Sequence, residues 1–136
     1  MYLVDTSVWI DYLRGRECTH VEFLRSLLPH PLVVGITHLI YVEILQGARN
    51  PSAFGRLRTY FAGQRFHTFA DAVRSHTLAA RMYLDCRREG VTVRSTVDCL
   101  VAQCAIESDL VLLHHDMDFR RIARVAPSLK EKSFLD

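Results

Sequence analysis

The sequence predicts an α/β fold, a three-layer α/β/α sandwich around a mostly parallel central sheet. Short apolar runs typical of buried strands alternate with helical segments along the whole chain, and no segment repeats internally. The 136 residues, 49% of them hydrophobic, are enough for one hydrophobic core and too few for two ordinary domains. We therefore expect a single domain over residues 1–136.

The first half of the chain contains strands and helices with recognisable ends. Pro29 ends one predicted helix, Gly15 and Gly47 end two others, and Asn50 followed by Pro51 is a typical helix start. The expected strands cover residues 1–4, 32–35 and 65–69, and the expected helices cover residues 7–14, 19–28, 38–46 and 51–62.

The second half continues the alternation. Helices are expected over residues 71–89, 95–109 and 118–125, with a buried strand over residues 110–115 and a final edge strand near Phe134. The helix at residues 95–109 is more apolar than the one at residues 71–89 and should be more buried. For the longest helix, the periodicity predicts one core-facing side made of Val73, Leu78, Ala79, Met82 and Cys86.

Composition constrains the function only weakly. Seventeen basic and fifteen acidic residues give a net charge of +2, which neither requires nor excludes a nucleic-acid partner. The four cysteines form no CxxC pair and no familiar Cys/His zinc spacing, so they are interpreted as small buried thiols. No stretch is as long as a membrane span and no signal peptide is visible, so we expect a cytoplasmic protein with no membrane partner.

Carboxylates follow two of the predicted strands directly. Asp5 ends the first strand, and Asp116 and Asp118 follow the strand "LVLLHH". In an open parallel sheet, ligands bind beyond the carboxyl ends of the strands, so these are suitable positions for catalytic groups. A simpler alternative is that Asp5 and one of the later acids only cap the helices that follow them.

Two further carboxylates lie on predicted helices. Glu43 is flanked by Val42 and Ile44, where a charge must be paired, bind a metal or reach water at the rim of the helix. Asp98 stands three residues after Ser95, which makes "STVD" a possible capping box. An aspartate in that first turn would also point toward the strand ends, so both interpretations of Asp98 stay open.

Clustered carboxylates cannot all ionise without a counterion. Oxygen ligands without a suitably spaced histidine or cysteine favour Mg²⁺ or Mn²⁺ over zinc. Such a centre suits phosphodiester hydrolysis, in which the cation activates water and neutralises charge on the leaving oxygen.

Four segments in this order resemble the PIN domain, and more narrowly the VapC-type toxins of prokaryotic toxin–antitoxin pairs: "YLVDTSVWIDYL", "YVEILQGA", "RSTVDCLVAQCA" and "LLHHDMDF". The resemblance implies a metal-binding catalytic site formed by Asp5, Glu43, Asp98 and Asp116, with Asp118 as an adjacent contributor. Thr6 and Ser7 stand where the family keeps a hydroxyl, and His114 replaces the Thr or Ser of many members. We expect Trp9 and Tyr12 to serve packing or dimerisation, and His115 to face solvent.

The resemblance implies a Mg²⁺- or Mn²⁺-dependent endoribonuclease that leaves 5′-phosphate and 3′-hydroxyl ends. One alternative is a PIN-like nuclease that acts on DNA or flap ends, because the cation does not choose between sugars. A second is a phosphoacceptor regulatory domain, which would need a lysine late on a strand, whereas Lys130 and Lys132 are expected in the C-terminal tail. A third is a non-catalytic binding module, which the complete acidic set disfavours.

Substrate and partner contacts complete the expectations. Arg94 precedes the Ser95 box and either holds a phosphate or is an ordinary surface arginine; Thr6 and Ser7 are further candidates for substrate contact. The resemblance also implies an RNA substrate, a homodimer and a VapB-type antitoxin seated in an apolar groove. The surplus apolar residues expected to form that groove are Trp9, Ile10, Leu13, Phe23, Leu24, Leu27, Phe54, Leu57 and Phe61.

Overall fold

A five-stranded sheet lies at the centre of the computed structural model, which describes all residues from Met1 to Asp136. Its strand order is β3-β2-β1-β4-β5, and every neighbouring pair is parallel. The strands are β1 (Tyr2–Val4), β2 (Val34–Ile36), β3 (Arg65–Phe66), β4 (Val111–Leu113) and β5 (Lys130–Lys132).

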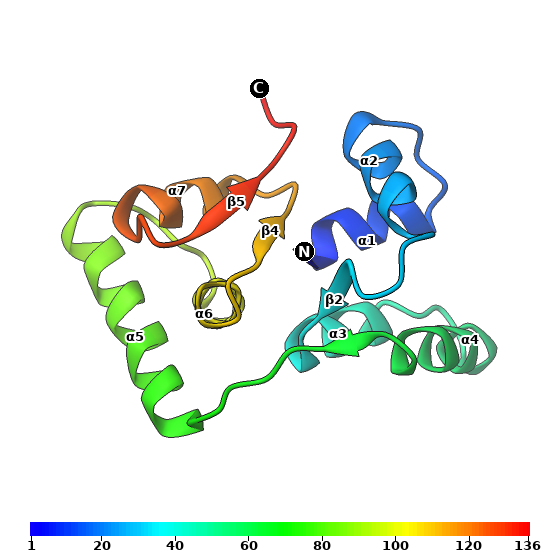
Figure 1. Cartoon of the computed structure of the whole chain (residues 1–136), viewed down its shortest axis with the longest axis horizontal. Helices are drawn as coiled ribbons and strands as arrows, with labels where there is room; N and C mark the ends of the chain where they lie inside the picture. The colour runs from blue at the N-terminus through cyan, green and yellow to red at the C-terminus, as the bar shows by residue number, and fades with distance from the viewer.

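Seven helices connect the strands: α1 (Thr6–Leu13), α2 (Thr19–Leu27), α3 (His38–Gln46), α4 (Pro51–Ala62), α5 (Ala72–Arg88), α6 (Thr96–Glu107) and α7 (Met117–Val125). Helix α1 contacts both α2 and α3, and α3 contacts α4, while α5, α6 and α7 form a second group of neighbours. Figure 1 shows α1, α2 and α4 on one side of the strands and α5 and α7 on the other. The predicted three-layer α/β fold is confirmed.

The strand order explains where a site can form. The chain runs outward from β1 to β2 and β3, then crosses to β4, which pairs with the opposite side of β1. Right-handed connections therefore put the two groups of helices on opposite faces. The connections diverge between β1 and β4, where Val4 pairs with Leu113 and both strands end. This is the position at which open α/β sheets bind their ligands.

The core lies on both faces of the two central strands. Leu3 and Val4 of β1 and Leu112 and Leu113 of β4 are fully buried, as expected for a parallel sheet covered on both sides. Trp9 is also fully buried, with its ring edge-on to that of Phe61 at a centroid distance of 4.9 Å. Trp9 is thus a packing residue.

The longest helix, α5, faces the core with a different set of residues from the one predicted. Val73 is 80% exposed and Leu78 is 36% exposed, while Ser75, Ala79, Met82 and Cys86 are buried. Ser75 can be buried because its hydroxyl donates a hydrogen bond of 2.8 Å to Glu107 on α6. The apolar pattern alone gave no sign of this polar pair.

The edge strand β5 lies earlier than predicted, at Lys130–Lys132 rather than near Phe134. Both lysines are therefore on a strand and not in a tail. Lys130 pairs with Asp109, which precedes β4, and the Lys132 ammonium lies over the rings of Phe23 and Phe134. Neither lysine contacts an acidic residue at the carboxyl ends of the strands, so the phosphoacceptor alternative still lacks its lysine. None of the helices combines the length and apolar character that crossing a bilayer requires.

Candidate metal centre

Asp5 and Asp116 lie at the divergence point between β1 and β4. Asp5 follows β1 and caps α1, accepting a hydrogen bond of 3.0 Å from the Ser7 backbone N–H. Asp116 follows β4 and caps α7, accepting one of 2.9 Å from the Asp118 N–H. The capping alternative is therefore correct for both residues, and it does not exclude a ligand role because each carboxylate has a second oxygen.

Asp98 does not complete the predicted capping box. The Ser95 hydroxyl accepts a hydrogen bond of 3.1 Å from the Val97 N–H, but no bond returns from the Asp98 carboxylate to Ser95. Instead, one carboxylate oxygen each from Asp98, Asp116 and Asp118 lie within 4.8 Å of one another. Burial and, after it, the charges of the neighbouring acids, including Asp5 and Glu43, together raise the pKa of Asp98 to about 7.

Glu43 is connected to the first helix rather than left in solvent. The Thr6 hydroxyl on α1 donates a hydrogen bond of 2.9 Å to Oε1 of Glu43 on α3. Burial raises the pKa of Asp5, the hydrogen bonds from Ser7 oppose this rise, and the Glu43 charge adds to it. Glu43 thus belongs to the electrostatic environment of Asp5 and Asp98.

Ser7 connects the two strand ends. Its hydroxyl donates a hydrogen bond of 2.6 Å to Oδ2 of Asp5 and accepts one of 2.9 Å from the His115 backbone N–H. The hydroxyls of Thr6 and Ser7 are therefore both engaged in holding protein groups. Their geometry is that of residues that position the acids, rather than of groups free to contact a substrate.

Arg94 lies against the acidic cluster and is not an isolated surface arginine. Its guanidinium is 3.0 Å from Oδ2 of Asp118 through Nε and 3.2 Å from Oδ1 of Asp116 through Nη2. Arg121 also donates to Asp118, at 2.9 Å. Burial would raise the pKa of Asp118, but the hydrogen bonds from Arg94 and Arg121 outweigh it, so that pKa is lowered. Arg121 was not among the predicted site residues, although an acid and a base three residues apart on one helix could have indicated it.

The two histidines after β4 are both enclosed. His114 is fully buried; its Nε2 lies 2.8 Å from Glu131 on β5, and its Nδ1 accepts a hydrogen bond of 3.2 Å from the Asp116 N–H. His114 therefore orients the backbone at Asp116. The prediction that His115 faces solvent is wrong, because its half-buried ring stacks on that of His20 at a centroid distance of 4.0 Å.

The interpretation of all four cysteines as buried thiols is correct for Cys86, Cys99 and Cys104. It fails for Cys18, which is only half-buried and has its sulfur 3.5 Å from Nε2 of His20. The sequence did contain a sign that Cys18 has polar neighbours. Cys18 and His20, two residues of types that can bind metals, stand close together and follow Asp11 on the preceding helix. No standard zinc motif has this spacing.

The cluster is suited to a hard divalent cation. Its donors are carboxylate oxygens, which Mg²⁺ and Mn²⁺ prefer. Asp98 keeps a proton up to about pH 7 because burial and the neighbouring negative charges oppose its ionisation, and a bound cation would offset the repulsion from those charges. The two arginines offset part of the negative charge but engage only Asp116 and Asp118.

A groove of about 800 Å³ begins beside Glu43. Its lining residues are Ile10, Leu13, Arg14, Glu43, Ile44, Gly47, Ala48, Arg49, Ala53, Arg56, Leu57 and Tyr60, from α1, α3, α4 and the loop between the last two. Of the apolar residues predicted to be surplus, Ile10, Leu13 and Leu57 line it. Trp9, Leu24 and Phe61 do not, because each is fully buried in the core.

The sequence matches the PIN domain family over residues 2–125. Among curated relatives, VapC ribonuclease Mb1587 of Mycobacterium bovis is 36% identical over 135 residues, covering 98% of this chain and 99% of the relative. Ribonuclease VapC11 of Mycobacterium tuberculosis has the same identity and coverage.

Solved structures show the same fold at lower sequence identity. The VapBC2 complex from Rickettsia felis, bound to a promoter DNA fragment, aligns with a TM-score of 0.73 at 14% identity over 98% of both chains. VapBC-1 from nontypeable Haemophilus influenzae aligns with a TM-score of 0.72 at 19% identity, over 97% of this chain and 96% of that one. With a family match over most of its length and full-length relatives at 36% identity, the chain belongs to the PIN-domain family and, within it, to the VapC ribonucleases.

Proposed function

We propose that this chain is a metal-dependent endoribonuclease toxin whose catalytic centre is the acidic cluster at the ends of β1 and β4. The observation that carries the proposal is the convergence of Asp98 with Asp116 and Asp118, together with a pKa of about 7 for Asp98. In our proposal Mg²⁺ or Mn²⁺ is held by Asp5, Asp98 and Asp116, with Glu43 and Asp118 as contributors.

The bound cation would supply a Lewis acid and a water nucleophile at neutral pH. The chain's own residues hold the acids in place: Ser7 fixes Asp5, and Thr6 fixes Glu43. The Arg94 side chain is 72% exposed, so it can turn from the carboxylates toward a phosphate at the rim. A planar guanidinium matches two phosphate oxygens, which makes Arg94 the proposed substrate contact.

The single most informative test is Asp98→Asn. Asparagine keeps the shape of the side chain but removes its charge, so RNA cleavage in Mg²⁺ should fall by about 100-fold or more. Asp85→Asn is the matched control, because Asp85 is a carboxylate on α5 that pairs only with Arg81. Full activity in Asp98→Asn would contradict the assignment of the centre.

Matched RNA and DNA strands test the substrate class. We expect cleavage of RNA, as the names of the curated relatives indicate for those proteins, and product ends that carry 5′-phosphate and 3′-hydroxyl groups. Preferential cleavage of DNA or flap ends would favour the alternative nuclease. Ends with 2′,3′-cyclic phosphate would show that the RNA's own 2′-hydroxyl, and not water, is the nucleophile.

We further propose that a VapB-type antitoxin occupies the groove beside Glu43, that the chain forms a homodimer and that it acts in the cytoplasm. Several solved structures with this fold are described as VapBC complexes. The groove combines apolar residues with Arg14, Arg49 and Arg56, so it suits an amphipathic segment with acidic side chains. A basic side chain at the end of that segment next to Glu43 could replace the cation there. Light scattering of the purified chain would test for the dimer.

A further inference from the structure

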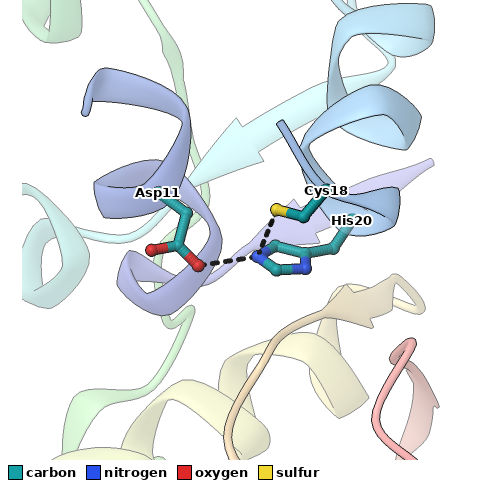
Figure 2. Close-up of side chains that lie close together, drawn as sticks. All are labelled: Asp11, Cys18 and His20. Carbon is teal, nitrogen blue, oxygen red and sulfur yellow. Dashed lines mark hydrogen bonds and ion pairs between the residues drawn. The ribbon is translucent and has the colours of Figure 1, made fainter. Parts of the chain in front are cut away.

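A second cluster of metal-ligating side chains lies outside the acidic centre. Asp11 is on α1, Cys18 immediately precedes α2, and His20 is in the first turn of α2. One ligand atom from each lies within 4.8 Å of the other two. Figure 2 shows the Asp11 carboxylate and the Cys18 sulfur approaching the His20 ring from two sides.

The geometry differs from that of a nucleophilic triad. In a Cys-His-Asp relay, the thiol and the carboxylate contact opposite nitrogens of the imidazole. Here Oδ2 of Asp11 lies 2.7 Å and Sγ of Cys18 lies 3.5 Å from the same atom, Nε2 of His20 (Figure 2). Three potential ligand atoms therefore converge on one small volume, where a shared cation could contact all of them.

The distances fit a small tetrahedral ion after a minor adjustment. Zinc bonds of about 2.1 Å to nitrogen or oxygen and about 2.3 Å to sulfur place neighbouring ligand atoms about 3.4 to 3.6 Å apart. The separation between Cys18 and His20 already has this value. Asp11 and His20 are closer, at 2.7 Å, because they share a hydrogen bond. Replacing that proton with an ion requires their atoms to separate by less than 1 Å.

The surroundings support a binding role. Asp11 is 7% exposed and His20 is 4% exposed, while Arg16 holds the other oxygen of Asp11 at 3.4 Å. Cys18 and His20 line a cavity of about 410 Å³, which offers an entry path and room for a further ligand. The cavity wall also includes His115, whose Nδ1 is buried without a hydrogen-bond partner.

We propose that Asp11, Cys18 and His20 bind a soft divalent cation, with Zn²⁺ as the ion best suited to the site. Thiolate and imidazole ligands select Zn²⁺ over Mg²⁺, which prefers oxygen. The site is therefore chemically distinct from the all-carboxylate centre. Because Asp11 is on α1 while Cys18 and His20 begin α2, the bound ion connects these two helices.

The test uses Co²⁺ as a spectroscopic substitute for Zn²⁺ in the full-length chain after treatment with a chelator. Coordination by the Cys18 thiolate should produce a near-ultraviolet charge-transfer band that saturates at one ion per chain and disappears when Zn²⁺ is added. Cys18→Ser should abolish the band and weaken binding at this site by about 100-fold. Cys104→Ser is the matched control, because Cys104 is a buried thiol that already donates to the His67 carbonyl.

The Asp98→Asn variant separates this site from the acidic centre, and it should keep the full charge-transfer band. A band that survives in Cys18→Ser, or cobalt binding that is lost only in Asp98→Asn, would overturn the proposal. A second measurement uses the unmodified chain: Zn²⁺ should slow alkylation of Cys18 by iodoacetamide, as mapped by mass spectrometry, and a chelator should restore the rate. Unchanged alkylation in saturating Zn²⁺ would also overturn the proposal.

Discussion

Asp98 shows how one side chain can satisfy a local pattern and still serve another purpose. The "STVD" sequence is a good capping box, yet only Ser95 makes its capping bond. The Asp98 carboxylate instead lies among other carboxylates, and burial and their charges raise its pKa to about 7. Asp98 thus lacks the hydrogen bond that would complete the capping box, and its carboxylate lies where ionisation is unfavourable. Such departures from local preference are expected at functional sites.

The pKa of Asp98 predicts a specific pH dependence of stability. Between its ordinary value of 3.8 and about 7, the folded metal-free chain keeps a proton that the unfolded chain has released. The free energy of unfolding should therefore fall as the pH rises through this range. Asparagine carries no ionisable group, so Asp98→Asn should not show this fall in the free energy of unfolding. At pH 8 in chelator the variant should therefore be more stable than the parent by about 2 kcal/mol.

Urea unfolding at pH 5 and pH 8 would measure the effect. The difference between Asp98→Asn and the parent should grow with pH, and Asp85→Asn should show no such growth. Adding Mg²⁺ at pH 8 should stabilise the parent more than the variant. Equal stabilities of parent and variant at pH 8 would mean that the pKa of Asp98 is not raised in the folded chain.

Among the elements of the fold, helix α1 contributes residues both to the acidic centre and to the cluster of Asp11, Cys18 and His20. Its N-cap is Asp5, its first turn carries Thr6 and Ser7, and Asp11 on its last turn faces α2. The Thr6 hydroxyl links α1 to Glu43 on α3, and the Ser7 hydroxyl links it to the backbone after β4. The short polar run after β1 is therefore a junction between three elements.

The link between α1 and α3 can be tested with Thr6→Val. Valine has nearly the same shape but cannot donate to Glu43, so the carboxylate loses the bond that orients it. We expect RNA cleavage to fall by about tenfold, and Thr6→Ser, which keeps the hydroxyl, to retain most of the activity. Steady-state kinetics of both variants would check this. Equal activity of Thr6→Val and Thr6→Ser would exclude the positioning role.

Several elements were predictable because local signals determine their ends. Thr37 and Gly47 bound α3 as expected, and the alternation of buried strands with helices identified the parallel sheet. Predictions failed where a distant partner decides the outcome. Ser75 replaces Val73 on the buried side of α5 because Glu107 binds it, and Cys18 meets Asp11 only once α1 and α2 have packed.

For the whole molecule, the strand order brings residues from distant segments to one edge of the sheet. Asp5 and Asp116 follow neighbouring strand ends because β1 and β4 pair, although more than a hundred residues separate the two acids in the sequence. The ordered acidic positions and the family resemblance indicated these candidates from the sequence. The contact of Arg94 with Asp118 required the structure, since it depends on how the loop before α6 approaches α7.

Glu43, one of the proposed acids of the catalytic centre, also lines the groove. Its apolar wall includes Leu13, which is 43% exposed, and Leu57. Its basic residues lie at the end of α1 (Arg14), just before α4 (Arg49) and on α4 (Arg56). A partner segment lying here would cover exposed apolar area and end beside the carboxylates. An exposed leucine that lines such a groove would be covered by the bound segment, so a charge placed there should oppose binding.

Leu13→Asp tests the groove as the antitoxin site. The new carboxylate would place an unpaired charge in the apolar wall, so the affinity for a VapB-type antitoxin should fall by about 100-fold. Val73→Asp is the matched control, because Val73 is an exposed apolar residue on α5, away from the groove. Co-purification and inhibition of RNA cleavage should be lost for Leu13→Asp and kept for Val73→Asp, with melting temperatures measured to show that both variants fold. Inhibition that persists in Leu13→Asp would place the antitoxin elsewhere on the molecule.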